Sequence, residues 1–162
     1  MLAMQTYPAD DAQRVAALHR LQILDTPPSV EFDQVAWSAK LLFEAPAAFV
    51  SFVDAERQWY KAKAGADLVE IDRRASFCSH CIAYRNPLWI EDTLLDPRVS
   101  DNPFVVGEPH IRFYAGAPIR DADGWLVGTV CVVDYIARPH DARLEHALSI
   151  LADMLSALFA PD

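Results

Sequence analysis

Positive charge is scarce in this sequence, and the scarcity limits the partners that the protein can have. The 162 residues include 14 Lys and Arg against 23 Asp and Glu, which gives a formal net charge of -9. Nucleic acids and anionic membrane surfaces are bound through clustered Lys and Arg, and no segment of this sequence concentrates them. We therefore expect neither nucleic acid nor a membrane as a partner.

Long apolar runs and a rich cysteine content are also lacking. No run approaches the roughly 20 residues of a transmembrane helix, and residues 1–10 lack the basic and apolar regions of a secretory signal peptide. The three cysteines, an odd number, indicate free thiols in a reducing compartment rather than a disulfide framework. We expect a cytoplasmic protein.

What is present is the composition of one compact domain with a real hydrophobic core: 52% of the residues are apolar and 23% are charged. We assign the whole chain, residues 1–162, to a single domain. The expected segments are the N-terminal helices over residues 1–44, a sheet with a pocket over residues 45–136, and a C-terminal helix over residues 137–162.

The hydrophobic pattern changes along these segments. Helical spacing recurs over residues 12–24 and again up to residue 44. Runs rich in β-branched and aromatic residues then predict strands, at residues 47–53, 58–64, 87–91, 111–119 and 125–133. Residues 92–109 contain three prolines and predict a long loop, which in a compact domain is usually functional.

Several short strings occur in one order along almost the whole chain. They are LDTPP from Leu24, VSFVD from Val50, WYKA from Trp59, SFCSH from Ser76, DPR from Asp96, RFYAGAP from Arg112 and GTVCVVD from Gly128. Together they resemble the GAF domain, a small-molecule sensor module widespread in bacterial signalling proteins, and above all the GAF domains that precede histidine kinase or diguanylate cyclase modules.

The resemblance implies an α+β fold with a central antiparallel sheet. Terminal helices would cover one face, and a ligand cavity would lie on the other, roofed by loops and a helix. The sequence ends just after the last predicted helix, so we expect no attached output domain. We expect instead a homodimer formed through the terminal helices, as in relatives, or contact with a signalling partner.

The stretch SFCSH holds the most reactive candidates. Ser76 is a good N-cap, which puts Cys78 and His80 in the first helical turn, where the helix dipole lowers the pKa of a thiol. Cys78 and Cys81 form a C-x-x-C pair, but not after a strand of a βαβ unit as in thioredoxin-like enzymes. Both are therefore expected to be small buried side chains on a helix that faces the pocket.

Bound metals and chromophores are disfavoured by the spacing of these residues. A zinc site would need Cys78, His80 and Cys81 to converge with Cys131 or His110, and residues two apart on a helix diverge. Phytochrome-type relatives attach a bilin to a Cys followed by His, the reverse of the order here. The signature of cyclic-nucleotide-binding GAF domains is absent too, so no metal or cofactor is required.

One alternative is enzymatic, because free methionine sulfoxide reductase is a catalytic GAF protein. Its mechanism needs a nucleophilic Cys and a resolving Cys. Cys78 falls near one of that family's cysteine positions. In that family a working cysteine lies in the loop that leads into the strand matched here by residues 110–116, and this sequence has His110, Arg112 and Tyr114 there but no Cys.

The candidate pocket residues combine this stretch with aromatic and polar residues of the strands and the loop. They are Trp59, Phe77, Cys78, His80, Cys81, His110, Arg112, Phe113, Tyr114 and Cys131. Strand alternation puts Arg112 and Tyr114 on one face and Phe113 on the other. Arg112 would bind an anion if it faces the cavity, or pair with a carboxylate if it faces outward.

Our interpretation is a domain that senses an unidentified small molecule and acts through dimer or partner contacts, without enzymatic activity of its own. The alternatives are a thiol enzyme like free methionine sulfoxide reductase, and a dimerisation scaffold whose interior is filled by its own side chains.

Overall fold

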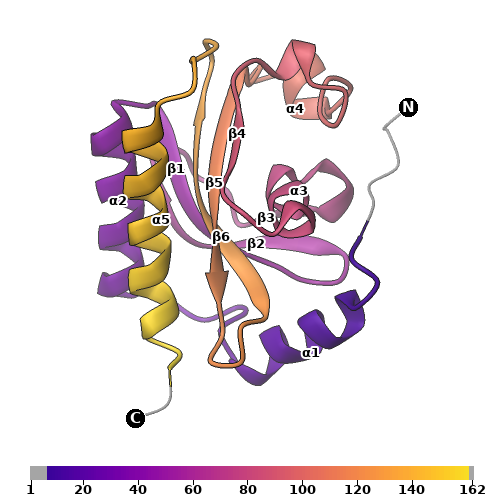
Figure 1. Cartoon of the computed structure of the whole chain (residues 1–162), viewed down its shortest axis with the longest axis vertical. Helices are drawn as coiled ribbons and strands as arrows, with labels where there is room; N and C mark the ends of the chain where they lie inside the picture. The colour runs from indigo at the N-terminus through magenta and orange to yellow at the C-terminus, as the bar shows by residue number, and fades with distance from the viewer. Residues whose placement is uncertain (1–6, 161–162) are drawn as a thin grey trace.

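The computed structural model describes residues 7–160, and within this range six strands form one antiparallel sheet. Their order is β3-β2-β1-β6-β5-β4. The bounds are β1 (Ala47–Val53), β2 (Arg57–Ala64), β3 (Glu70–Asp72), β4 (Leu88–Ile90), β5 (Phe113–Arg120) and β6 (Leu126–Asp134). The α+β fold predicted from the sequence is confirmed (Figure 1).

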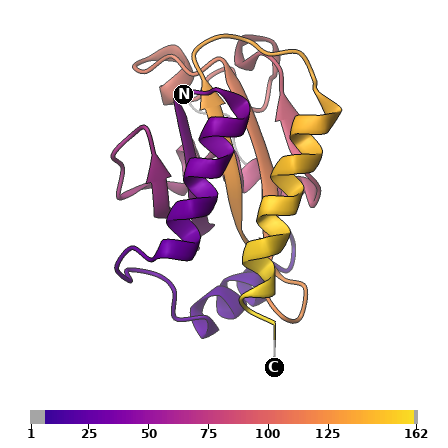
Figure 2. The ribbon, with the colours of Figure 1, turned by 90° about the vertical axis from the view of Figure 1, so that its left-hand side faces the viewer.

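Two helices, α2 (Val30–Phe43) and α5 (Ala142–Ala157), lie side by side over one face of the sheet (Figures 1 and 2). The helix α5 begins at Asp141, whose carboxylate accepts hydrogen bonds from the N–H groups of Arg143 and Leu144, which would otherwise lack partners. The helix α2 ends at Glu44 in the left-handed conformation, as is common for a C-cap.

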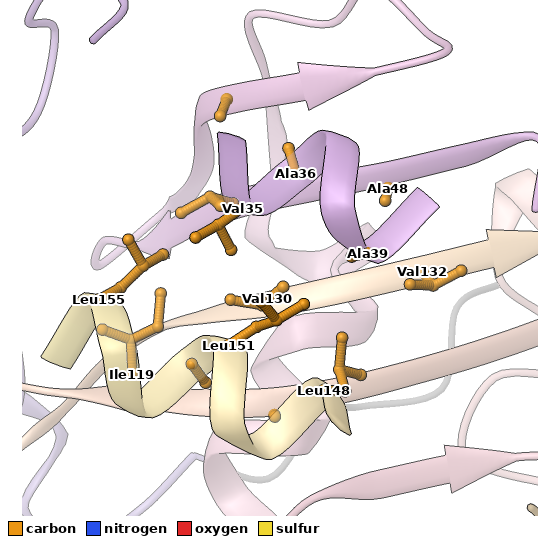
Figure 3. Close-up of a cluster of buried hydrophobic side chains, with 14 of the residues drawn as sticks. Val35, Ala36, Ala39, Ala48, Ile119, Val130, Val132, Leu148, Leu151 and Leu155 are labelled. Atoms are coloured by element: carbon orange, nitrogen blue, oxygen red, sulfur yellow. The ribbon is translucent and has the colours of Figure 1, made fainter. Parts of the chain in front are cut away.

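The contact between these helices and the sheet is a closely packed apolar layer. On α2 the small side chains of Ala36 and Ala39 are fully buried, so the helix can approach the strands closely. On α5, Leu148 and Leu151 lie over the central strands, close to Val130 of β6 (Figure 3). This layer contributes most of the hydrophobic stabilisation on that face.

The helix α1 (Asp11–Arg20) lies at one end of the sheet, the lower end in Figure 1. Asp11 joins it to the pocket side, because its carboxylate accepts hydrogen bonds from Arg14 at 2.9 Å and from the buried Arg73 at 2.6 Å. The predicted helix over residues 12–24 is too long at its C-terminal end, since the chain turns after Arg20 and Gln22 has a φ of 53°.

The other face is covered by short pieces. These are the 3-10 turns η1 (Arg73–Ala75) and η2 (Thr93–Leu95), with the helices α3 (Phe77–Tyr84) and α4 (Pro103–Val106). The loop predicted over residues 92–109 contains η2 and α4. The strand β3, which pairs with β2, was not predicted, because its three residues are mostly charged.

No helix in the described part of the chain is both long enough and apolar enough to cross a membrane.

Candidate functional site

A cavity of about 260 Å³ lies between the sheet and the short elements of its second face. Strands, α3 and loops contribute its walls, which are formed by Ala47, Phe49, Gln58, Tyr60, Ala66, Asp67, Leu68, Ile71, Phe77, Cys78, Phe104, Pro109, Ile111, Tyr114, Cys131, Val133 and Tyr135. Cys78 and Tyr114 are each 1% exposed, whereas Asp67, Pro109 and Tyr135 are exposed. The cavity therefore runs from the interior to the surface.

The walls are mainly aromatic and aliphatic. Phe77 and Tyr114 stack with their ring centroids 5.4 Å apart, and Phe49 and Tyr60 lie 4.9 Å apart. Asp67 at the rim is the charged residue of the lining, and no Lys, Arg or His from residues 7–160 takes part in it. An anionic ligand would lack a partner here, so the site suits an uncharged, mainly apolar guest.

The sulfur of Cys78 lies at the inner end of this cavity and is surrounded by hydrogen-bond donors. Four described side chains point donors at Sγ: Thr129 Oγ1 at 2.9 Å, Tyr114 Oη at 3.2 Å, Gln58 Nε2 at 3.3 Å and Ser51 Oγ at 3.6 Å. A neutral thiol is only a weak acceptor, whereas a thiolate is a strong one. The arrangement favours the thiolate.

The orientation of Gln58 follows from its neighbours. The Ser76 hydroxyl accepts the N–H of Ser79 as N-cap of α3 and donates its own proton to Gln58 Oε1. The amide nitrogen is thereby directed at Cys78 and at Ser51 Oγ, 3.1 Å away. The N-cap of the helix that holds Cys78 thus also orients a donor to its sulfur.

The pKa values of the thiols follow from these contacts. Burial raises the pKa of Cys78, but hydrogen bonds from Cys131, Thr129, Tyr114 and Ser51 outweigh it and lower the pKa from 9.0 to about 7. The hydrogen bond to Cys78, followed by burial, raises the pKa of Cys131 well above its ordinary value. Burial likewise raises the pKa of Cys81. Cys78 is therefore the nucleophilic thiol of the three.

Gly116 makes room for this cluster. It lies opposite Cys131 in the β5–β6 register, two residues after Tyr114 on the same face of β5. A Cβ atom at Gly116 would overlap the hydroxyl and ring of Tyr114. The absence of a side chain lets Tyr114 lie along the strand and reach Cys78.

Tyr114 was predicted, whereas Ser51, Gln58, Gly116 and Thr129 were not singled out from the sequence. Ser51, Gly116 and Thr129 lie within the strings that resemble the GAF domain, and Ser51 and Thr129 are polar residues inside otherwise apolar strands that are buried on both faces. A buried hydroxyl needs a partner, and that need is the signal which could have found them.

The structure brings together some of the predicted pocket residues. Phe77, Cys78, Tyr114 and Cys131 line the cavity, and their role in binding stays a prediction. The placement of Trp59 and Phe113 was wrong, because both lie on the opposite face of the sheet, in the core under α2 and α5.

The reason for this error is strand alternation on a sheet that is buried on both sides. The cavity is lined by Tyr60, the residue that follows Trp59, and not by Trp59 itself. Phe113 instead packs against Trp89, with ring centroids 4.9 Å apart, and against Phe43. Apolar character alone does not say which face of such a strand meets the helices.

The remaining predicted residues lie outside the cavity lining. His80 is half-buried, and burial, followed by the charge of Arg98, lowers its pKa. Cys81 is buried, and its thiol donates to the Asn86 carbonyl at 3.6 Å.

The polar residues before β5 are also directed away from the cavity. His110 is exposed, at a φ of 60°. Arg112 donates from Nη1 to the carbonyls of Val105 and Ile111, so it holds the loop instead of binding an anion in the cavity. Among residues 7–160, no three or more His, Cys, Asp or Glu side chains are grouped to hold a metal ion.

The comparisons with known proteins agree with this fold. The family model described as GAF domain matches residues 11–160, which confirms the resemblance seen in the sequence. The chain is 39% identical over 150 residues to a cyclic di-GMP phosphodiesterase of Pseudomonas aeruginosa, a match that covers 90% of this chain and 26% of that protein. The chain thus spans about a quarter of that relative's length.

Solved structures with the same fold are more distant in sequence. A free methionine-R-sulfoxide reductase from Neisseria meningitidis superposes with a TM-score of 0.66 at 17% identity, over 98% of this chain and 96% of the other. The GAF domain of a phosphoenolpyruvate-protein phosphotransferase from Coxiella burnetii gives 0.65 at 17% identity, over 92% and 94%. At these identities the likeness shows the fold.

The expectation that the chain is not an enzyme is contradicted by these findings. The curated relative is named a phosphodiesterase, and the structures of the same fold include reductases from Neisseria meningitidis and Thermoplasma acidophilum. The chain therefore resembles part of a protein that is named as an enzyme. The expectation had rested on the incomplete cysteine set, because residues 110–116 contain no Cys.

Proposed function

Because the chain belongs to the GAF domain family, we propose that it binds a small molecule in the cavity beside Cys78 and thereby controls cyclic di-GMP phosphodiesterase activity. The observation that carries this proposal is the cavity itself, which is apolar, about 260 Å³ in volume and open to the surface at one end. The phosphodiesterase part is supported by the 39% identity to the Pseudomonas aeruginosa enzyme.

The walls indicate the chemistry of the ligand. Aromatic side chains such as Phe49 and Phe77 favour a flat apolar or aromatic group. The inner end offers the hydroxyl of Tyr114 and the sulfur of Cys78. We expect an uncharged molecule with one polar group directed at that end, rather than a nucleotide, whose phosphates need cationic partners.

The outer face of α2 and α5 offers a route by which binding could change activity. Trp37 and Leu41 of α2, together with Met154 of α5 and Leu158 just after it, are large apolar side chains exposed by 49% or more. They border one surface groove. An exposed apolar face of this kind suits a second copy or a partner protein. The central strands β1 and β6 contact both this helical layer and the cavity, so a guest in the cavity acts on the layer through them.

The test uses a chimera, since the chain aligns with a defined segment of the Pseudomonas aeruginosa enzyme. That segment is replaced by this chain, and hydrolysis of cyclic di-GMP is measured with and without indole and 2-phenyl-2-propanol as uncharged aromatic probes. Calorimetry on the isolated chain reports their binding. We expect binding and a change in hydrolysis rate, both lost in Ala47→Phe, which fills the cavity from β1.

The matched control is Ala83→Phe, which adds the same side chain at an exposed position of α3 and should leave both readouts unchanged. Probe binding without any change in hydrolysis would remove the regulatory part of the proposal. If neither indole nor 2-phenyl-2-propanol binds to the wild-type chain, and the melting temperature of Ala47→Phe equals that of the wild type, the cavity is not a ligand site.

A second candidate function is a reductase of free methionine sulfoxide. The observation that favours it is the Cys78 sulfur, whose pKa is lowered to about 7 and which shares the cavity lining with a second thiol, that of Cys131. The cavity lining supplies no cation for the substrate carboxylate, which is why this candidate stands second. Consumption of free methionine-R-sulfoxide with dithiothreitol, abolished in Cys78→Ser and retained in Cys81→Ser, would establish it.

A further inference from the structure

Two thiols of different character meet at the inner end of the cavity. Cys78 lies in the first turn of α3 and Cys131 in the middle of β6, and both contribute to the cavity lining. Thr129 of β6 donates to the Cys78 sulfur at 2.9 Å, and Cys131 follows two residues later on the same face of β6, so the two thiols lie near one another. We propose that Cys78 and Cys131 form an oxidant-reactive pair, which reduces a small organic hydroperoxide held in the cavity and closes to a disulfide.

The first step is attack of the Cys78 thiolate on the terminal oxygen of the hydroperoxide. A sulfur–oxygen bond forms, the oxygen–oxygen bond breaks, and the alcohol leaves after taking up a proton from solvent. Cys78 is oxidised by two electrons to the sulfenic acid, and the hydroperoxide is reduced to the alcohol. The hydroxyls of Thr129 and Tyr114, at 2.9 and 3.2 Å from Sγ, hold the thiolate for this attack.

In the second step Cys131 resolves the sulfenic acid. Its sulfur displaces the hydroxyl group from Cys78, and the thiol proton of Cys131 leaves with that group as water. The products are the Cys78–Cys131 disulfide and one water molecule. An external thiol then restores both cysteines.

The position of the third cysteine argues that this pairing is specific. Cys81 lies one turn further along α3, outside the cavity lining, and its thiol is directed to the Asn86 carbonyl. The C-x-x-C spacing suggests a Cys78–Cys81 pair, but the hydrogen bonds to the Cys78 sulfur come from the strands. Cys131 is therefore the partner, although 53 positions separate it from Cys78 along the chain (131 minus 78).

The walls of the cavity select the class of oxidant. Phe49, Phe77 and Phe104 surround the path to the sulfur, and these rings bind an alkyl or aryl group but give hydrogen peroxide nothing to contact. An organic hydroperoxide gains the burial of its apolar part. This inference rests on the proposed role of the cavity as a ligand site and adds the chemistry of the guest.

The experiment compares cumene hydroperoxide with hydrogen peroxide on the reduced chain. Each rate is divided by the rate of the same oxidant with free cysteine, which removes the intrinsic reactivity of the oxidant. We expect the normalised rate to be at least about tenfold higher for cumene hydroperoxide, because its aryl group is buried in the cavity. Peptide mapping of the product should show a Cys78–Cys131 disulfide.

Variants separate the two steps. Cys78→Ala should stop consumption of the hydroperoxide, and Cys131→Ala should accumulate a sulfenic acid that dimedone traps at Cys78. Cys81→Ala is the matched control and should form the disulfide at the wild-type rate. If a variant fails to fold, the proposal is still tested on the wild-type chain, by the ratio of its normalised rates with the two oxidants and by the peptide map of its disulfide.

The outcomes also distinguish this inference from the proposed function. Calorimetry with 2-phenyl-2-propanol, the alcohol product of cumene hydroperoxide, reports binding without oxidation. If that alcohol binds but the two oxidants react at equal normalised rates, or the disulfide involves Cys81, the redox pair is refuted and the ligand site remains. If the alcohol does not bind and no disulfide forms, both are refuted.

Discussion

The two faces of the sheet bury apolar side chains in different ways. On one face, the long helices α2 and α5 lie side by side over the strands (Figure 2). Over the other face, α3 has eight residues and α4 has four, with the 3-10 turn η1 before α3 and η2 before α4. Short elements joined by loops leave space between their side chains, and the cavity lies in that space. The difference shows that a single sheet separates the densely packed core of this domain from its cavity.

The chemistry of the faces differs as well as their packing. Both faces bury polar groups, but of different kinds. Lys61 lies over the Phe32 ring on the helix-covered face and donates to Thr26 and Pro27. The cavity side instead buries Ser51, Gln58 and Thr129 around Cys78. Buried polar groups of this kind stabilise a fold only when they are mutually satisfied. They are retained here, we infer, because they hold a thiolate.

The largest expected effect comes from two phenylalanines of the same strand. Phe52 packs against Phe32 and Phe159 on the helix-covered face, and Phe49 packs against Tyr60 in the cavity. Phe52→Ala should lower the free energy of unfolding by about 3–5 kcal/mol. Phe49→Ala should cost only about 1–2 kcal/mol, because its site already borders an open cavity that water can enter.

Urea unfolding of both variants against the wild type measures this contrast. Equal losses would mean that the cavity side is packed as densely as the helical side, and the comparison between the two faces would fail.

A smaller effect concerns the dependence of stability on pH. The pKa of Cys78 is about 7 in the folded chain against an ordinary value of 9.0. Between these values the unfolded chain binds more protons than the folded one, so the stabilisation rises with pH, is complete above about 9, and is lost as the pH falls through about 7. Full ionisation corresponds to about 2–3 kcal/mol.

The measurement is the free energy of unfolding of the wild type minus that of Cys78→Ala, at pH values from about 6 to about 10. The subtraction removes the other titrating groups. A difference that stays flat, or one that falls with rising pH, would show that Cys78 is not a thiolate in the folded protein.

The donors to the sulfur differ in their expected effect on its ionisation. Thr129→Val removes the nearest hydroxyl, at 2.9 Å, and keeps the shape of the side chain. The pH midpoint of Cys78 alkylation by iodoacetamide should rise from about 7 by about one pH unit, equivalent to about 1.4 kcal/mol. Thr93→Val is the matched control, since Thr93 is equally buried but donates to the Ile111 carbonyl. A midpoint that moves equally in both variants would argue against a specific role for Thr129.

The helix-covered face was easier to predict from the sequence than the cavity. Continuous apolar runs indicate β1, β5 and β6, and the leucine spacing of α5 indicates its buried stripe, because both patterns are local. The strand β3 was missed since two of its three residues, Glu70 and Asp72, are charged and uncommon in strands, and it pairs only because β2 lies beside it.

The site shows the same limit at the level of single residues. Cys78 was found because a helix N-terminus is visible in a local string. Its activation was not, because the sulfur meets Ser51, Gln58, Tyr114 and Thr129 from four separate strands. Such contacts depend on the order of the strands in the sheet and on the face to which each side chain points. The spacing of residues within one segment predicts neither.

The smallest expected effect concerns Asp67 and tests whether its charge at the rim of the cavity contributes to ligand binding. Asp67 is the charged residue of the lining, but its side chain is 96% exposed and pairs with Lys63 at 3.1 Å. Water screens such a carboxylate, so Asp67→Asn should change the affinity for 2-phenyl-2-propanol by less than about twofold, or about 0.4 kcal/mol. Asp123→Asn, in the β5–β6 hairpin away from the cavity, provides the calorimetric baseline. If Asp67→Asn weakens binding tenfold, the rim carboxylate takes part in recognition. The two faces would then differ not only in packing but also in a charged hydrogen-bond acceptor at the entrance, and the polar group of the ligand would be directed at that rim instead of at the inner end.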